Sequence, residues 1–131
     1  MEPAKRFAEY AAAFEETFAD DDWGRLKPYF AEDAIYAVTG GPPFGGRWEG
    51  RKQLLQQLRK SVNEVDRTFD ERHLELLGTP TVGENSIKVR WRVTYTKAGC
   101  PDVVVDGTER ATFDGDRIRL LEDSIEDGVD R

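Results

Sequence analysis

The carboxyl group best suited to proton transfer belongs to Glu109, in the stretch VVVDGTERATF. Successive residues of a β-strand point to opposite faces, so Glu109 shares its face with Val105 and Ala111. Burial among apolar side chains disfavours the charged form of a carboxyl group and raises its pKa, which suits a proton donor or shuttle. A β-bulge near Gly107 would instead turn Glu109 towards solvent, because a one-residue shift exchanges the two faces of a strand.

Three further side chains could assist such chemistry: Asp123, Tyr36 and His73. Asp123 lies in the last predicted strand, beside Leu121 and Ile125. The phenol of Tyr36 can donate a hydrogen bond to a ligand oxygen, or it can be a core tyrosine whose hydroxyl reaches the surface. His73, the only histidine, is a candidate acid or base because an imidazole ordinarily titrates near neutrality. The pattern leaves its face undecided, and a structural strand histidine is the alternative reading.

The sequence predicts no metal site and no cofactor. Protein metal sites usually combine several His, Cys or carboxylate ligands, and this chain has one histidine and one cysteine. Cys100 sits in a Gly-Cys-Pro turn, where a nucleophilic role would need a nearby base. The candidate chemistry therefore rests on carboxyl groups, a phenol and one imidazole.

A glycine- and proline-rich loop, GGPPFGG at residues 40–46, joins a predicted strand to a predicted helix. It lacks the Gly-Lys-Ser/Thr ending of a phosphate-binding loop, and its two prolines remove backbone amide donors that a phosphate would need. A phosphate cradle is therefore excluded. A lid at the mouth of a pocket and a plain connector both remain open, because long loops are often functional but need not be.

The charge of the chain argues against polyanionic partners. Its 131 residues carry 19 Lys and Arg against 26 Asp and Glu, a formal net charge of -7. Phosphate backbones and anionic lipid surfaces repel such a chain, so neither nucleic acid nor membrane is expected as a partner. No apolar run is long enough to span a bilayer, and the initial MEPAKRF lacks the apolar core of a signal peptide. We therefore expect a cytoplasmic location, with which a single cysteine is consistent.

The length suits one domain over residues 1–131, whose first half is rich in helix. Apolar residues recur at helical spacing over residues 3–19, with a proline suited to the first turn. Asp22 can cap a short second helix that carries Trp23, Leu26 and Phe30. Residues 33–39 are predicted to form a strand, and residues 50–65 a third helix with one apolar side.

The second half has the pattern of an antiparallel sheet. Four strands are predicted near residues 69–82, 86–97, 102–114 and 117–125, separated by short turn signals. The second is the clearest, because apolar and polar residues alternate along it from Ile87 to Thr96. One face of the sheet is therefore buried, and the helices of the first half must cover it. This arrangement is an α+β domain.

The order of these elements resembles the nuclear transport factor 2-like superfamily, and particularly its SnoaL-like branch. The resemblance covers nearly the whole chain, and its most specific local element is Asp-Trp at residues 22–23, followed by FAEDA at residues 30–34. It implies a cone-shaped fold in which a strongly bent, mostly antiparallel sheet wraps around three helices. The open end of that cone is a pocket for small, often apolar molecules. Members include isomerases, cyclases, epoxide hydrolases, dehydratases and non-catalytic binding domains, so the resemblance fixes no activity.

The resemblance to ketosteroid isomerases is incomplete. Glu109 falls near the position where those enzymes keep a protonated acid, but the positions of their base and tyrosine are occupied here by Val38 and Phe14. In cyclases of the superfamily a histidine works with an aspartate, which is the role that the resemblance suggests for His73.

The resemblance to limonene-type epoxide hydrolases is also partial. Asp123, Tyr36 and Arg92 fit their pattern, whereas Thr94 and Val38 replace the second carboxylate and the amide. The alternation of the strand moreover places Arg92 on the wet face, away from any pocket.

The expected partner is a small hydrophobic molecule, held in a pocket lined by aromatic side chains from several elements. The candidates for this lining are Tyr36, Phe14, Trp23, Trp48 and Trp91. We expect either an enzyme that uses Glu109 or Asp123 for acid–base catalysis or a binding domain without turnover. A third possibility is a protein-interaction module that uses the wet sheet face at residues 88–94. The resemblance also implies a homodimer, formed through the sheet face.

Overall fold

The computed structural model describes residues 2–40 and 45–126 of the chain. The first half contains helix α1 (Pro3–Asp20), the 3-10 helix η1 (Trp23–Tyr29), strands β1 (Phe30–Thr39) and β2 (Gly46–Glu49), helix α2 (Arg51–Glu64) and the 3-10 turn η2 (Asp66–Thr68). The second half contains β3 (Glu71–Val82), β4 (Ser86–Thr96), β5 (Val103–Asp114) and β6 (Arg117–Ile125). The predicted α+β class and the order of its elements are confirmed.

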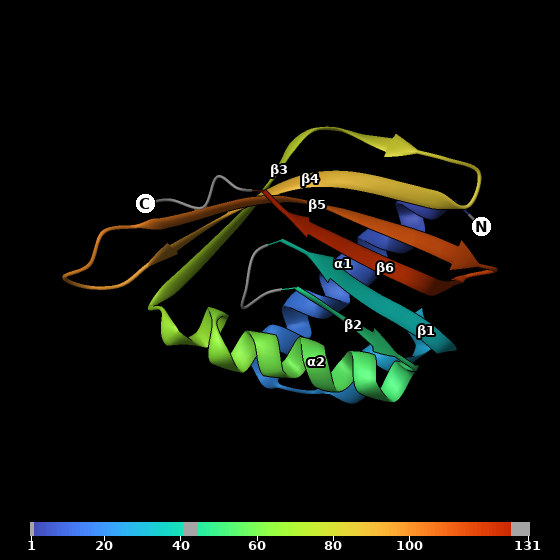
Figure 1. Cartoon of the computed structure of the whole chain (residues 1–131), viewed down its shortest axis with the longest axis horizontal. Helices are drawn as coiled ribbons and strands as arrows, with labels where there is room; N and C mark the ends of the chain where they lie inside the picture. Colours follow the sequence, from blue (N-terminus) through green and yellow to red (C-terminus); the bar gives the residue numbers. More distant parts are fainter. Residues whose placement is uncertain (1, 41–44, 127–131) are drawn as a thin grey trace.

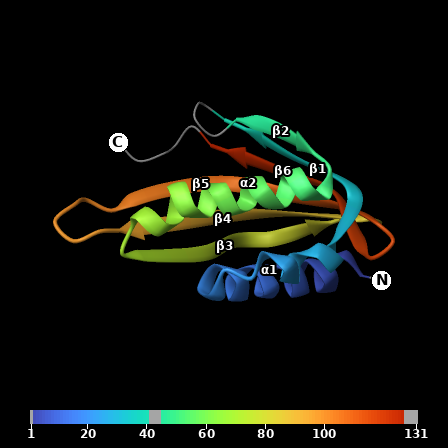
Figure 2. The same cartoon turned by 90° about the horizontal axis from the view of Figure 1, so that it is seen from below.

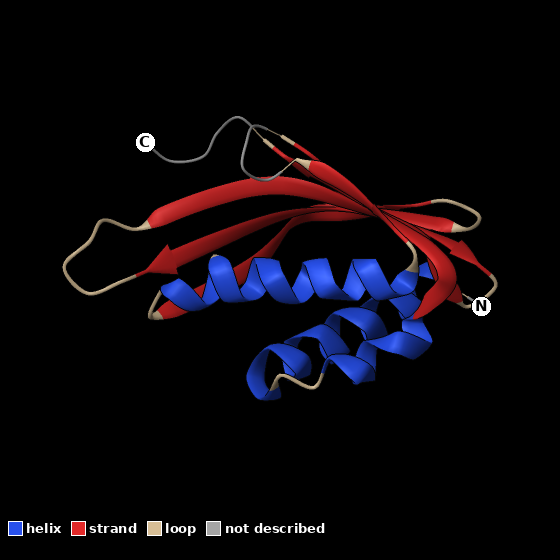
Figure 3. Cartoon of the chain, turned by 60° about the horizontal axis from the view of Figure 1, so that its bottom comes forward, coloured by secondary structure: helices blue, strands red, loops and turns tan. Residues whose placement is uncertain are grey.

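The six strands form one curved sheet in the order β2-β1-β6-β5-β4-β3 (Figure 1). All neighbouring strands are antiparallel except β1 and β6, which run parallel. The helices lie on one side of the sheet (Figure 3), and α2 crosses that side (Figure 2), while α1 contacts η1 and β4. The resulting bent sheet over three helical segments confirms the predicted architecture.

Helix α1 begins as its sequence predicts and buries one face. Pro3 occupies the first turn, where the missing N–H needs no intrahelical partner. Tyr10 is buried at the centre of that face, and its ring meets Phe30 of β1 edge to face, with 5.4 Å between the ring centroids. Phe30 and Leu26 have no exposed surface, so the junction of η1 and β1 is held in the centre of the core.

The acidic run after α1 works differently from the prediction. Asp22 precedes η1 but makes no side-chain capping hydrogen bond. Asp21 ends α1 in the left-handed conformation, with φ 63, and its carboxylate accepts hydrogen bonds from Trp23 Nε1 (2.6 Å) and Arg67 (3.1 Å). The predicted capping hydrogen bond of Asp22 is therefore wrong. The neighbouring carboxylate, that of Asp21, instead joins the end of α1 to η1 and to the segment after α2.

The glycine-rich loop leads into an edge strand that the sequence pattern did not reveal. Gly46 to Glu49 pair antiparallel with β1, and Trp48 lies opposite Tyr36. Most of the predicted lid or connector, residues 41–44 of GGPPFGG, lies outside the described residues. Among the residues that are described, neither α-helix is both long and apolar enough to cross a membrane.

Candidate functional site

The two carboxyl groups predicted from the sequence meet on the inner face of the sheet, the face that the helices cover. Glu109 of β5 and Asp123 of β6 are directly opposite each other in the antiparallel register. Each carboxyl group changes the pKa of the other, and we call these two residues the carboxyl pair. Glu109 is followed on its face by the buried Ala111 and Phe113, so no bulge turns it to solvent. The alternation along β5 thus placed Glu109 correctly.

The carboxyl pair is protonated more readily than ordinary carboxylates. Burial raises the pKa of Glu109 well above its usual value, and the neighbouring charge of Asp123 raises it further. Burial also raises the pKa of Asp123, but hydrogen bonds from Glu109 and Tyr36 oppose that rise. Two carboxyl groups in contact away from water cannot both ionise cheaply. The larger rise in the pKa of Glu109 favours Glu109 as the member that carries a shared proton, with Asp123 as the carboxylate.

Tyr36 of β1 completes the pair from the neighbouring strand. Its hydroxyl donates to Asp123 Oδ2 at 2.9 Å, which stabilises the ionised aspartate. Asp123 Oδ1 is enclosed and accepts no hydrogen bond from a donor side chain or backbone group in the described structure. Leaving a buried acceptor unpaired costs about 1–3 kcal/mol. The proton on Glu109 offers one partner for this oxygen.

Tyr10 of α1 is a fourth member that sequence reasoning missed. Burial raises the pKa of its phenol well above the usual value, and the charges of Glu109 and Asp123 raise that pKa further. The pKa of Tyr36 is raised in the same way, by burial first and by Asp123 next. Both phenols therefore stay neutral donors. The signal for Tyr10 was available, since it is the polar group in the middle of an apolar helix face.

Aromatic rings flank the carboxyl pair on two sides. Trp48 stacks on Tyr36, with the ring centroids 5.6 Å apart. Trp91 of β4 lies opposite Gly107 of β5, two residues from Glu109 on the same face. Both tryptophans are half-buried, which suits the lining of a small-molecule site.

The other predicted site residues lie elsewhere. His73 is exposed, opposite Thr94 on the outer face of the sheet, so it is separated from the carboxyl pair by the sheet itself. Arg92 lies on the same outer face, as the alternation predicted, and makes a two-point ion pair with Asp106 at 2.7 and 2.9 Å. Phe14 and Trp23 pack edge to face, 6.1 Å apart, in the helical layer.

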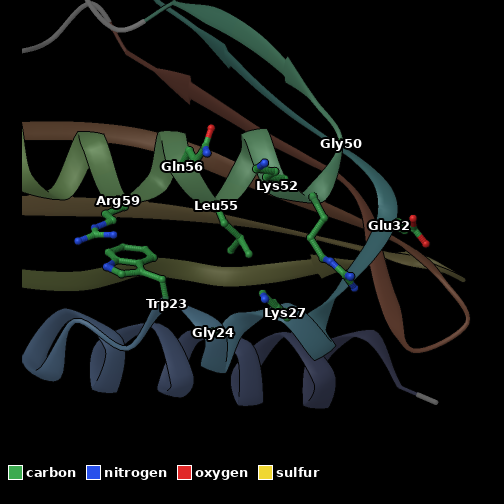
Figure 4. Close-up of a pocket in the computed structure, with 10 residues that line it drawn as sticks. Trp23, Gly24, Lys27, Glu32, Gly50, Lys52, Leu55, Gln56 and Arg59 are labelled. Atoms are coloured by element: carbon green, nitrogen blue, oxygen red, sulfur yellow. The ribbon is translucent and has the colours of Figure 1, made fainter.

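An open groove of about 630 Å³ lies on the helical side of the molecule, between η1 and α2. Trp23 and Leu55 face each other across it, and Arg59, Lys52 and Lys27 surround them (Figure 4). None of its lining residues belongs to the carboxyl pair or contacts it through a described hydrogen bond. Facing acids with raised pKa values are the stronger sign of chemistry, so we place the candidate site at the carboxyl pair and not in this groove.

Comparison with known proteins agrees with this fold. The SnoaL-like domain family matches residues 11–121, and the chain therefore belongs to that family. No curated protein sequence matches it.

Solved structures with the same fold are numerous and distant in sequence. Bal32a, from a soil-derived mobile gene cassette, is 19% identical, with a TM-score of 0.70 over 95% of this chain and 92% of that chain. A proposed isomerase from Rhodopseudomonas palustris is 17% identical, with a TM-score of 0.73 over 92% and 89% of the two chains. TerC, co-crystallised with polyporic acid, is 14% identical, with a TM-score of 0.67 over 92% of both chains. At these identities the comparisons establish the fold alone.

Proposed function

We propose that this chain is a small-molecule enzyme of the SnoaL-like type that moves protons on a small apolar substrate. The observation that carries the proposal is the carboxyl pair, in which two half-buried carboxyl groups lie on directly opposite strand residues and each changes the pKa of the other. Groups with separated protonation states in one apolar site are suited to general acid–base catalysis. Proposed isomerases of the same fold, from Rhodopseudomonas palustris and from the SnoaL-like family of Agrobacterium tumefaciens, make an isomerisation the first reaction to test.

In this proposal Asp123 is the base and Glu109 the acid. The Asp123 carboxylate takes a proton from the carbon next to a substrate carbonyl, and the electron pair of that C–H bond moves to form an enolate. Glu109, or the newly protonated Asp123, then returns a proton to carbon, at the same or a conjugated position. Tyr36 holds Asp123 in place through its 2.9 Å hydrogen bond. The reaction balances without a cofactor, since no electrons are gained or lost.

An unpaired donor supports a binding space beside the pair. Trp91 Nε1 is enclosed without a hydrogen-bond partner in the described structure, and Asp123 Oδ1 is offered only the proton of Glu109. TerC of the same fold was co-crystallised with an organic acid, polyporic acid, which agrees with a small-molecule ligand for this chain.

The test uses a simple apolar ketone, 1-indanone, whose α-protons exchange slowly in D₂O. We expect the wild-type chain to bind 1-indanone and to speed up the loss of its α-proton NMR signals. Binding with the ketone recovered fully protonated would instead support a non-catalytic binding domain, the second function that the sequence left open. Absence of binding by any apolar ketone would contradict both.

We also propose that the outer face of the sheet pairs two copies of this chain. Its residues include Arg90, Arg92 and Thr94, and Arg90 is paired with Glu126 at 3.0 Å. Arg92→Glu would replace the cation that pairs with Asp106 by a second negative charge on this face. Two such faces would repel each other, so the variant should sediment as a monomer where wild type sediments as a dimer. Asp33→Asn, an exposed change on β1, is the control. A wild-type monomer at micromolar concentration, or a variant that remains dimeric, would contradict this pairing.

A further inference from the structure

The indole nitrogen of Trp91 is an enclosed donor without a partner. Three such side-chain atoms occur among the described residues: Arg72 Nε, Trp91 Nε1 and Asp123 Oδ1. Arg72 Nε lies 2.9 Å from Asp66 Oδ2, so its charge is compensated even where the hydrogen-bond angle is poor. Asp123 Oδ1 can accept the proton of Glu109, so the donor of Trp91 is the atom that is left unexplained. The indole N–H of a buried tryptophan normally has a hydrogen-bond partner, so the missing partner at Trp91 indicates room for a ligand acceptor.

The backbone of β5 holds this donor in place. Gly107 lies directly opposite Trp91, and a Cβ atom at Gly107 would stand 2.4 Å from Trp91 Cζ2 and 2.8 Å from Cε2. The indole thus lies flat across β5 in space that only a glycine leaves open. Nε1 is bonded to Cε2, so the N–H starts from a point over Gly107, two residues from Glu109 on the same face. The donor and the carboxyl pair consequently border the same part of the inner face.

We propose that Trp91 Nε1–H donates a hydrogen bond to the oxygen of the bound substrate, and that the site therefore selects neutral carbonyl compounds. This inference rests on the proposed function, because it names the substrate class of the same site. A carbonyl oxygen accepts from the indole while its neighbouring carbon faces Asp123. In the proton transfer that oxygen gains negative charge, so the same donor binds the developing enolate more strongly than the ketone.

The charges around the site favour a neutral ligand over an anion. Glu109 and Asp123 together carry a negative charge when they share one proton. The other inner-face residues of β4, β5 and β6 are apolar or aromatic, apart from Gly107, and they include no Lys, Arg or His. The inner face of β3 carries Arg72, but its charge is already paired with Glu15 and Asp66, each at 2.9 Å. A carboxylate ligand would therefore lose its hydration without gaining an unpaired cation there, which is unfavourable. A neutral carbonyl needs only the single donor that Trp91 supplies.

The test compares three ligands of one ring system: 1-indanone, indane and indane-1-carboxylate. Dissociation constants are measured by NMR titration of the wild-type chain and of Trp91→Phe, which keeps an aromatic ring and removes the donor. We expect wild type to prefer 1-indanone over indane by about tenfold, and the variant to lose this preference. Indane-1-carboxylate should bind more weakly than 1-indanone to both. Trp23→Phe should keep the preference, since Trp23 Nε1 already donates to Asp21.

A second readout is taken on the wild-type chain, and the variant serves only to assign one signal. The indole N–H signal of Trp91, identified by its loss in Trp91→Phe, should move downfield in wild type with 1-indanone and not with indane. Equal affinity of wild type for 1-indanone and indane, or an unmoved indole signal, would overturn the role of Trp91 while leaving a pocket in place. Tighter binding of the carboxylate would overturn the selection for neutral compounds. A wild-type chain that binds neither 1-indanone, indane nor indane-1-carboxylate would contradict both this inference and the proposed function.

Discussion

Asp123→Asn is expected to lower the catalysed α-proton exchange of 1-indanone by about 100-fold or more, the usual contribution of a general base. Asparagine nearly matches the volume of aspartate and can still accept the hydrogen bond that Tyr36 donates at 2.9 Å. It cannot accept a proton from carbon. The loss should therefore appear in the exchange rate, with little change in the dissociation constant for 1-indanone.

Asp106→Asn provides the matched control for this loss. Asp106 is also a strand aspartate, but it lies on the outer face of β5 and pairs with Arg92. Its replacement should leave the exchange rate unchanged. If Asp123→Asn exchanges protons as fast as wild type, Asp123 is not the base and the proposed mechanism is wrong.

The second large effect concerns stability and pH. Glu109 has a pKa well above its usual value in the folded chain, because it is buried beside Asp123. A folded-state pKa raised above the unfolded value means that the folded state binds the extra proton. The stabilisation is fully present below the pKa of Glu109 in the unfolded chain, and it is lost as the pH rises towards the raised folded value. The contribution of Glu109 to the free energy of unfolding should therefore fall as the pH rises from the unfolded-state pKa to the folded-state pKa.

Glu109→Gln should remove this loss. Glutamine stays neutral at every pH and can still donate a hydrogen bond to Asp123. Urea unfolding between pH 5 and 8 should show the variant gaining on wild type by up to about 1.4 kcal/mol per pH unit in the free energy of unfolding. Glu84→Gln, an exposed change in the turn before β4, should follow wild type throughout. Parallel stability curves for wild type and Glu109→Gln would show that Glu109 is an ordinary carboxylate.

Local periodicity was sufficient to predict the elements that carry the site. The three-and-four spacing of apolar residues predicted α1 and α2, and the alternation along β4 and β5 placed Trp91 and Glu109 on the inner face. These predictions succeeded because one face of each element is buried and the other is wet, which leaves a direct trace in the sequence.

Features that depend on distant parts of the chain left no such trace. The parallel pairing of β1 with β6 brings Tyr36 to Asp123 from 87 residues away, and nothing in either segment encodes that contact. Strand β2 has four residues beside a glycine-rich loop, too few for a periodic signal. The sequence marks Tyr10 as a polar group on an apolar helix face, but its approach to both acids depends on how α1 packs on the finished sheet.

The outer-face position of His73 shows the same limit. The residues at even spacing from His73, which share its face of the strand, include both acidic and apolar side chains, so alternation alone could not decide whether that face is buried. The register of β3 against β4 decides it by placing His73 opposite Thr94. The predicted cap at Asp22 likewise depended on backbone geometry that the sequence does not show. Asp21 adopts the left-handed conformation, and it is the carboxylate of Asp21 that accepts the hydrogen bond from Trp23.

The most direct measurement of the central claim is a carboxyl ¹³C NMR titration of Glu109 and Asp123 in the intact chain, with Asp123→Asn used for assignment. Our account predicts that Glu109 remains protonated at pH 7 while Asp123 is ionised, and that the two signals change together as the shared proton leaves. Two carboxylates already ionised by pH 6, each with the titration curve of an exposed side chain, would contradict it.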